Sequence, residues 1–301
     1  MSIAWLDWSN PVAIWWGSLL AVSTVNVAVL LALCWRFRGD WASRSGVTWV
    51  EPLLILAAGY VIGCAFRSVL PRADVQRICL FDTYLSSVLV GRSVATVAEL
   101  CFAAQWAIVL YALGKVARSD TAKNIAKLVV PLIVLAECCS WFAVVTTDFL
   151  GNVLENSLWT VTFLLIGVAL ARLVTRFHGA VQAAIAAATA GIAGYVTFMA
   201  SIDVPMYFSR WQADVLSGKT YLGLTAGLHD LATRWVVTHD IGQWHDEIAW
   251  MTLYFSTAVW ASLLLAAFAL VQPLLPRYRV RVPLILPRPT RRPVAVAVRS
   301  S

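Results

Sequence analysis

The chain has 301 residues, of which 60% are hydrophobic and only 13% are charged, with a formal net charge of +7 and a mean hydropathy of +0.75. These values lie outside the range of soluble globular domains. The apolar residues fall in blocks of about twenty, the length that crosses a bilayer core. A water-soluble enzyme, a disordered chain and a disulfide framework are therefore excluded.

Seven segments are long and apolar enough to be transmembrane helices, and they predict an all-α integral membrane protein. In chain order the predicted spans are Val12–Trp35, Pro52–Val69, Leu85–Leu113, Leu128–Asp148, Ser157–Val174, Ala180–Ser201 and Ile248–Gln272. Residues 1–272 thus form the transmembrane domain, with one long outer loop at 202–247. Residues 273–301 form a Pro/Arg-rich tail that we expect to be disordered or bound to the membrane surface.

The positions of the basic residues predict the orientation, because basic loops are retained on the cytoplasmic side of a membrane. With the N-terminus outside, sixteen of the 23 Lys and Arg residues fall in cytoplasmic segments, seven of them in the tail. We therefore expect an outer N-terminus and a cytoplasmic C-terminus, with the tail on anionic lipid headgroups. The absence of a targeting peptide and the Arg- and Ala-rich composition favour a bacterial inner membrane.

Several membrane chemistries need residues that the predicted spans lack. A retinal protein needs a lysine in the last span, and a b-type haem needs histidines within helices. The phosphate-binding loop GxxxxGK[ST], the dinucleotide fingerprint GxGxxG and the zinc motif HExxH are also absent. We therefore expect no haem, retinal, nucleotide or nucleic acid, and a divalent metal stays a candidate cofactor. Outer Cys79 could form a disulfide with Cys64 or Cys101.

Two glutamates lie inside predicted spans, where an ionisable side chain is costly and faces a partner or a cavity. Glu99 belongs to the third span and Glu137 to the middle of the fourth. Helical spacing puts Arg92 and Glu99 on one face, and Glu137 and Asp148 on one face of the next helix. These faces predict a polar pocket that opens to the non-cytoplasmic side. The alternative is a protonated Glu137 that only holds two helices in register.

Other polar residues converge on the same membrane surface, as a binding or hydrolytic site would require. The predicted ligand-binding residues are Arg67, Arg92, Glu99, Asp148, Glu155 and Asp203. The predicted catalytic residues are Glu137, His245 and Glu247, whose carboxyl and imidazole groups suit proton transfer. Three histidines of the outer loop, each followed by aspartate, are candidate metal ligands: His229, His239 and His245. The alternative for them is a solvated loop with helix-capping aspartates.

Three functions stay open at this stage. The first is a membrane enzyme acting on a lipid or headgroup, with Arg67 and Arg92 binding an anionic group such as phosphate. The second is a proton- or cation-coupled transporter or sensor that uses Glu99 and Glu137. The third is a non-catalytic scaffold or accessory subunit of a membrane complex. The concentration of ionisable groups on one side favours a pocket that binds a polar or amphiphilic ligand.

Overall fold

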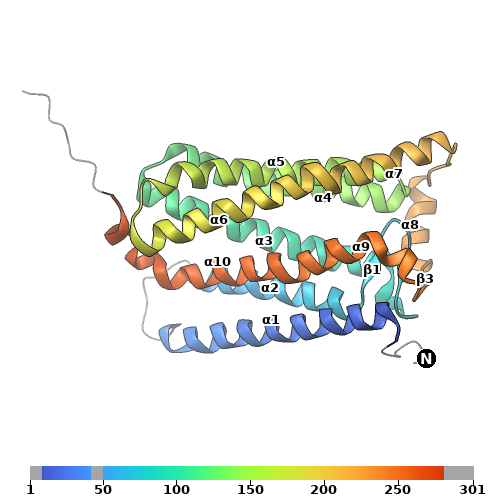
Figure 1. Ribbon diagram of the computed structural model, residues 1–301, viewed down its shortest axis with the longest axis horizontal. Helices are drawn as coiled ribbons and strands as arrows, with labels where there is room; N and C mark the ends of the chain where they lie inside the picture. The colour runs from blue at the N-terminus through green and yellow to red at the C-terminus, as the bar shows by residue number, and fades with distance from the viewer. Residues whose placement is uncertain (1–8, 42–49, 281–301) are drawn as a thin grey trace, which may run out of the picture.

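The computed structural model describes residues 9–41 and 50–280. Seven helical segments in this part of the chain are long and apolar enough to cross a membrane. The prediction of an all-α membrane protein with seven candidate spans is therefore confirmed. The long helices lie side by side along one axis, as Figure 1 shows.

The first five candidate spans are single helices. They are α1 (Pro11–Trp41), α2 (Val50–Val69), α3 (Val88–Ala117), α4 (Asp120–Thr146) and α5 (Phe149–Val174). The last two each contain one π-helical turn. The sixth consists of α6 (Gly179–Phe198), η2 (Met199–Asp203) and α7 (Val204–Leu216), and the seventh of α9 (Ile241–Leu253), η3 (Tyr254–Ala258) and α10 (Val259–Val271). The seventh is followed by η4 (Gln272–Tyr278), where the predicted tail begins; residues 281–301 of that tail lie outside the described residues.

Helix α3 lies at the centre of the bundle and packs against α2, α4, α5 and α10. Small residues let α2 approach α3 closely, because a side chain at Gly63 would meet Ala98 of α3. The aromatic ring of Tyr60 from α2 stacks on Phe102 of α3 with 4.6 Å between ring centroids. The polar residues Arg92, Glu99 and Gln105 of α3 are buried between helices and must find their partners inside the bundle.

Several helix ends differ from the predicted ones, each for a local reason. Helix α3 begins at Val88, because the side chain of Ser87 accepts the Val90 amide as its N-cap. Helix α4 ends at Thr146, since Thr147 adopts a left-handed backbone conformation with φ of 62°. The predicted placement of Asp148 on the helix of Glu137 was therefore wrong.

The predicted outer loop 202–247 is largely helical instead. The sixth span continues to Leu216, well past Ser201, and the seventh begins at Ile241. Between them lies the short helix α8 (Leu224–Thr233), whose Leu231 is fully buried. The polar residues that predicted a loop here lie in α7 and α9, which continue the sixth and seventh spans beyond their apolar parts.

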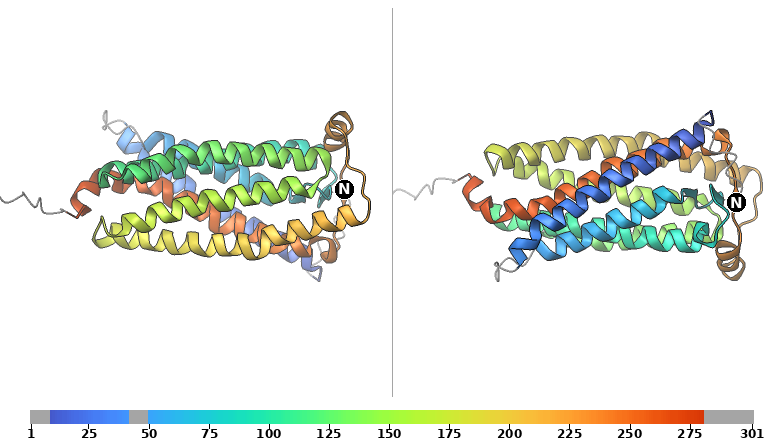
Figure 2. Two further views of the ribbon diagram at one scale, coloured as in Figure 1. Left: turned by 90° about the horizontal axis from the view of Figure 1, so that it is seen from above. Right: turned by 90° about the horizontal axis from the view of Figure 1, so that it is seen from below.

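One end of the bundle is closed by a small sheet and α8, and we call it the capped end. Strands β1 (Arg72–Ala73) and β2 (Ile78–Cys79) pair antiparallel, and β2 pairs in parallel with β3 (Val236–Val237). The 3₁₀ turn η1 (Tyr84–Ser86) leads from this sheet into α3. The N-terminal end of α1 lies here, and η4 lies at the opposite end of the bundle (Figures 1 and 2).

Hydrogen bonds of buried Arg77 connect the sheet at the capped end to α8 and α4. Its guanidinium donates hydrogen bonds to Asp230 of α8 (2.8 Å), to the Asp74 carbonyl (2.7 Å) and to the Val144 carbonyl of α4 (2.6 Å). The bonds to Asp230 and Val144 link the turn between α2 and α3 to two separate helices, and the bond to Asp74 closes the turn itself. The sheet and α8 therefore have a fixed position over the polar interior of the bundle.

Candidate functional site

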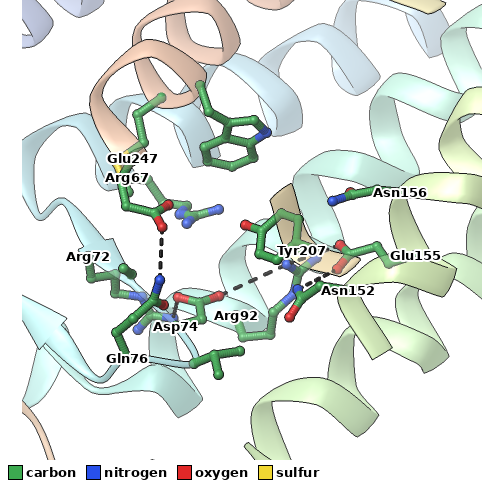
Figure 3. A pocket seen from close by; sticks show the side chains of 14 residues that line it. Arg67, Arg72, Asp74, Gln76, Arg92, Asn152, Glu155, Asn156, Tyr207 and Glu247 are labelled. Atoms are coloured by element: carbon green, nitrogen blue, oxygen red, sulfur yellow. Dashed lines mark hydrogen bonds and ion pairs between the residues drawn. The ribbon is translucent and has the colours of Figure 1, made fainter. Parts of the chain in front are cut away.

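A small, partly open polar pocket of about 50 Å³ lies beneath the sheet at the capped end. Its walls come from the end of α2, the β1–β2 turn, α3, α5, α7 and α9. Figure 3 labels the polar residues that line it: Arg67, Arg72, Asp74, Gln76, Arg92, Asn152, Glu155, Asn156, Tyr207 and Glu247. The pocket thus joins arginines and carboxylates from segments far apart in the sequence.

Arg67, in the last turn of α2, lines this pocket without a hydrogen-bonding partner for its Nη1. The residue is only 5% exposed, and its guanidinium carbon lies 6.0 Å from the centre of the Trp250 ring. A buried guanidinium donor without an acceptor is costly, and such a group calls for an anion or ordered water. Arg67 is therefore the clearest anion-binding group of the pocket.

Arg72 has a structural role at the pocket wall. It donates to the backbone carbonyls of Ser87 and Val88, the latter at 2.9 Å, and to Asp74 at 2.8 Å. Its guanidinium packs on Gly91, where any side chain would collide with it. Burial lowers the pKa of Arg72 to about 10, so it stays protonated at neutral pH.

Asp74 in the β1–β2 turn is the acidic partner of these arginines. Burial by itself would raise its pKa, but the positive charges of Arg72, Arg67 and Arg92 outweigh burial and hold the pKa below its ordinary value. The Asp74 carboxylate also forms an ion pair with Arg92 (Figure 3), with 4.0 Å between Oδ2 and Nη1. The Asp74 carboxylate therefore stays ionised, and its negative charge holds the neighbouring arginines in place.

Arg92 connects the pocket to three buried glutamates, which we call the acid cluster: Glu99, Glu137 and Glu155. Its Nη2 lies 2.7 Å from Glu99 Oε2 and 2.8 Å from Glu137 Oε2, and its Nη1 lies 3.6 Å from Glu155 Oε1. One oxygen of each glutamate lies within 4.8 Å of one oxygen of the other two, a spacing that a divalent cation could bridge. In the structure, however, the Arg92 guanidinium already supplies the positive charge between them.

Neighbouring side chains orient the acid cluster. Thr96 donates to Glu137 at 2.6 Å and accepts from the Trp141 indole at 3.0 Å. Tyr254 donates to Glu99 at 3.0 Å and is the first residue of the π-helical segment η3. Single π-helical turns within α-helices occur frequently at functional sites. The helix irregularity in the seventh span therefore coincides with a contact to the acid cluster.

A second polar group joins α7 to α9 at the pocket edge. Arg210 of α7 pairs with Asp246 at 2.8 Å and with Glu247 at 3.2 Å, and Gln76 donates to Glu247 at 2.9 Å. Asp203, the last residue of η2, is 2% exposed and within electrostatic reach of Arg210 and Glu247. This group holds the extended ends of the sixth and seventh spans against the cap.

Most of the predicted pocket residues come together. Arg67, Arg92, Glu155 and Glu247 line the pocket, and the carboxyls of Glu99 and Glu137 bind Arg92 next to it. Two predicted ligand-binding residues are elsewhere. Asp203 is buried close by but outside the lining, and Asp148 is the N-cap of α5, its Oδ1 accepting the Leu150 amide at 2.9 Å.

The histidines predicted as metal ligands do not meet. The His245 side chain is 84% exposed, contacts Asp246 and does not line the pocket. His239 bonds to the Leu80 carbonyl at 3.0 Å, and His229 contacts Thr233 within α8. Within residues 9–41 and 50–280, the one group of three side chains spaced to hold a metal is the acid cluster. All six cysteines are unpaired, including Cys79, Cys64 and Cys101.

Sequence reasoning missed Asp74, Gln76 and Asn156, which all line the pocket. Asp74 and Gln76 stand in the Arg-rich stretch between the second and third spans, and that unusual charge density was the available signal. Asn156 carries no signal of its own, because a single amide near the end of a span is common.

Comparisons with protein families, with characterised proteins and with solved structures give no match. The chemistry of the site therefore follows from its geometry alone. Buried arginine donors on one wall suit an anionic group, and carboxylates and amides on the facing wall suit hydroxyl or amine donors. The acid cluster behind Arg92 can hold protons or a cation.

Proposed function

We propose that the protein is a membrane protein whose pocket at the capped end binds a polar or amphiphilic ligand carrying an anionic group. The observation that carries this proposal is Arg67, a buried guanidinium that lines the pocket and has no acceptor for Nη1. A phosphate, sulfate or carboxylate group would supply that acceptor and offset the cost of burying the charge.

The facing wall narrows the ligand class. Glu155, Asn152 and Asn156 of α5 present carboxylate and amide groups, and the Oδ1 of Asn152 lacks a donor. A ligand with hydroxyl or amine groups beside its anionic group would satisfy both walls. Trp250 and Met251 add apolar surface to the same pocket, which suits a headgroup that carries a hydrocarbon chain.

The distribution of basic residues supports an outward-facing pocket. The capped end carries the N-terminal end of α1, which the positive-inside rule assigns to the non-cytoplasmic side. We place the protein in a bacterial inner membrane on the grounds of its composition. The ligand would then enter from the outer leaflet or from the aqueous phase outside it.

An enzyme acting on a lipid headgroup is the more specific form of this proposal. Its general acid or base would be Glu155 or Glu247, the two glutamates of the pocket wall, rather than His245. A transporter or sensor is the second candidate, and the link from the pocket through Arg92 to Glu99 and Glu137 favours it. The third candidate, a non-catalytic scaffold, is favoured if no ligand binds to the pocket.

The test is anion binding to purified protein in nanodiscs, with inorganic phosphate in one arm and dihexanoyl phosphatidic acid in the other. We expect Arg67→Gln to weaken binding by about tenfold or more, since a charged hydrogen bond contributes roughly 1.5–3 kcal/mol. The matched control is Arg172→Gln, because Arg172 is an exposed arginine in the last turn of α5.

The two arms separate the possible sources of the anionic group. Binding of phosphate alone indicates a free anion, and much tighter binding of the short-chain lipid indicates a headgroup. If the wild-type protein binds neither probe, or if Arg67→Gln binds both as well as the control does, the proposal is wrong.

A further inference from the structure

The acid cluster carries more negative charge than its neighbours neutralise. Glu99, Glu137 and Glu155 are each at least nine-tenths buried, and Arg92 is the cation that contacts all three. Three ionised carboxylates around one guanidinium would leave two uncompensated negative charges inside a helical bundle. Such charges are costly enough that carboxyl groups take up protons instead.

The geometry shows where a proton fits. The carboxyl groups of Glu99 and Glu137 both contact Arg92 Nη2, at 2.7 Å and 2.8 Å, and one oxygen of each lies within 4.8 Å of one oxygen of the other. The Oε1 of Glu137, a residue only 4% exposed, has no hydrogen-bond donor in the structure. Two ionised carboxylates this close repel each other, whereas one proton shared by the pair removes a charge and supplies the missing hydrogen-bond donor, as in other carboxyl dyads.

A proton explains the cluster better than a metal ion does. Arg92 Nη2 stands 2.7 Å and 2.8 Å from the two carboxyls, which is the position that a bridging cation would need. A metal ion would have to displace a guanidinium that is itself buried.

The other titratable groups near the cluster cannot replace the glutamates as proton carriers. They are Asp74 in the β1–β2 turn, Tyr60 and Cys64 of α2, Cys139 of α4, Tyr195 of α6, Tyr207 of α7 and Tyr254 of η3. The phenols and thiols are neutral near pH 7. Asp74 is paired with Arg72. Asp203 of η2 and Glu247 of α9 are also buried acids at the pocket edge, where Arg210 lies beside both. The glutamine variants of the acid cluster therefore assign the proton, because they leave Asp203 and Glu247 in place.

The cluster reaches the pocket through two residues. Glu155 and Arg92 both line the pocket, and Arg92 contacts Glu99 and Glu137 on its other side. An anion bound in the pocket would compete with the glutamates for the positive charge of Arg92. The glutamates would then be less well compensated and would bind a proton more tightly.

From these observations we propose that Glu99 and Glu137 share a proton that exchanges with the pocket by way of Glu155, and that anion binding in the pocket is accompanied by proton uptake at this cluster. The proton comes from water in the pocket and returns to it, so no bond other than O–H is made or broken. The coupling rests on the proposed function, whereas the shared proton does not. Because linkage is reciprocal, anion binding should become tighter as the pH falls.

The first experiment needs no ligand. Infrared spectra of the wild-type protein at neutral pH should contain the C=O stretching band of a protonated carboxylic acid, which shifts when water is replaced by D₂O. The band should disappear in Glu99→Gln and in Glu137→Gln and should persist in Asp120→Asn, a control at an exposed acid of α4. A wild-type protein without the band, or a band that survives both glutamine variants, overturns the shared proton. If a glutamine variant does not fold, Glu137→Asp, which keeps the acid group, should shift the band rather than remove it, and an unshifted band overturns the shared proton.

The second experiment measures the Kd of inorganic sulfate, an anion that does not titrate near neutral pH, across a pH series. One linked proton makes the Kd fall by up to tenfold for each pH unit of acidification, since that is the limiting slope for one site. The Glu137→Gln variant should lose this dependence. Sulfate binding that does not change with pH overturns the coupling alone. An acid band without any sulfate or phosphate binding overturns the proposed function and leaves the shared proton standing.

Discussion

Arg92 is the residue whose removal should have the largest effect on the interior of the bundle. Its side chain is 7% exposed and makes charged hydrogen bonds of 2.7 Å and 2.8 Å to Glu99 and Glu137. In Arg92→Gln both carboxylates lose their cation, and breaking a buried pair in this way costs about 3–5 kcal/mol. Proton uptake by the glutamates relieves part of this cost, so we expect a loss of about 3 kcal/mol in the free energy of unfolding at pH 8.

The pH dependence of this loss separates electrostatics from packing. Because protonated glutamates no longer need the guanidinium, the difference between Arg92→Gln and wild type should shrink as the pH falls. Combining Arg92→Gln with Glu137→Gln should cost less than the sum of the two single changes, by roughly 0.5–3 kcal/mol.

Steric trapping in bicelles, which reports the free energy of unfolding within a bilayer, is the assay for Arg92→Gln. The exposed Arg172→Gln is the control for loss of a positive charge. A loss under about 1 kcal/mol at pH 8, or a loss that does not change with pH, would refute the view that Arg92 compensates buried carboxylates.

Three further changes test the cap and the site. The pKa of Asp74 is lowered in the folded protein, so the ionised carboxylate stabilises the fold fully at pH values well above 3.8, and this stabilisation is lost as the pH falls below that value. The free energy of unfolding of Asp74→Asn should therefore lack this decrease at acidic pH. Gly227→Ala puts a methyl group onto the Val145 carbonyl and should cost about 1–3 kcal/mol, whereas Gly191→Ala, with nothing within 4 Å, should leave the melting temperature nearly unchanged. His245→Ala should bind both phosphate probes as tightly as the wild type does, because the His245 side chain is exposed and outside the pocket lining. A clear loss of binding would mean that the imidazole contacts the ligand.

Hydrophobic block length predicted the spans well where an end coincides with a change in polarity. The end of α2 at Val69 and the end of α5 at Val174 agree with the sequence, because the apolar run stops there. The sixth and seventh spans were placed too short, since α7 and the start of α9 are polar helices beyond the apolar run. Hydropathy measures what can lie in lipid, and it does not measure where a helix stops.

Helical periodicity found the centre of the site for the same physical reason that it finds amphipathic helices. Arg92 and Glu99 are seven residues apart and therefore share a face, and their side chains do meet at 2.7 Å. The presence of Glu137 inside an apolar span indicated that it needed a partner. The sequence does not say that this partner is Arg92 of the neighbouring helix.

By itself the amino-acid sequence determined the class of protein, the number of candidate spans and the glutamates that need compensation, because each of these depends on composition and local spacing. Only the tertiary structure decided which charges meet. Asp74 reaches the arginines through a two-strand turn, and Glu247 joins the pocket from a helix that begins earlier than hydropathy suggests. His245, two residues before Glu247, points outward instead. Adjacent residues on a helix point about 100° apart, so the packing of each helix selects which of them enters the pocket.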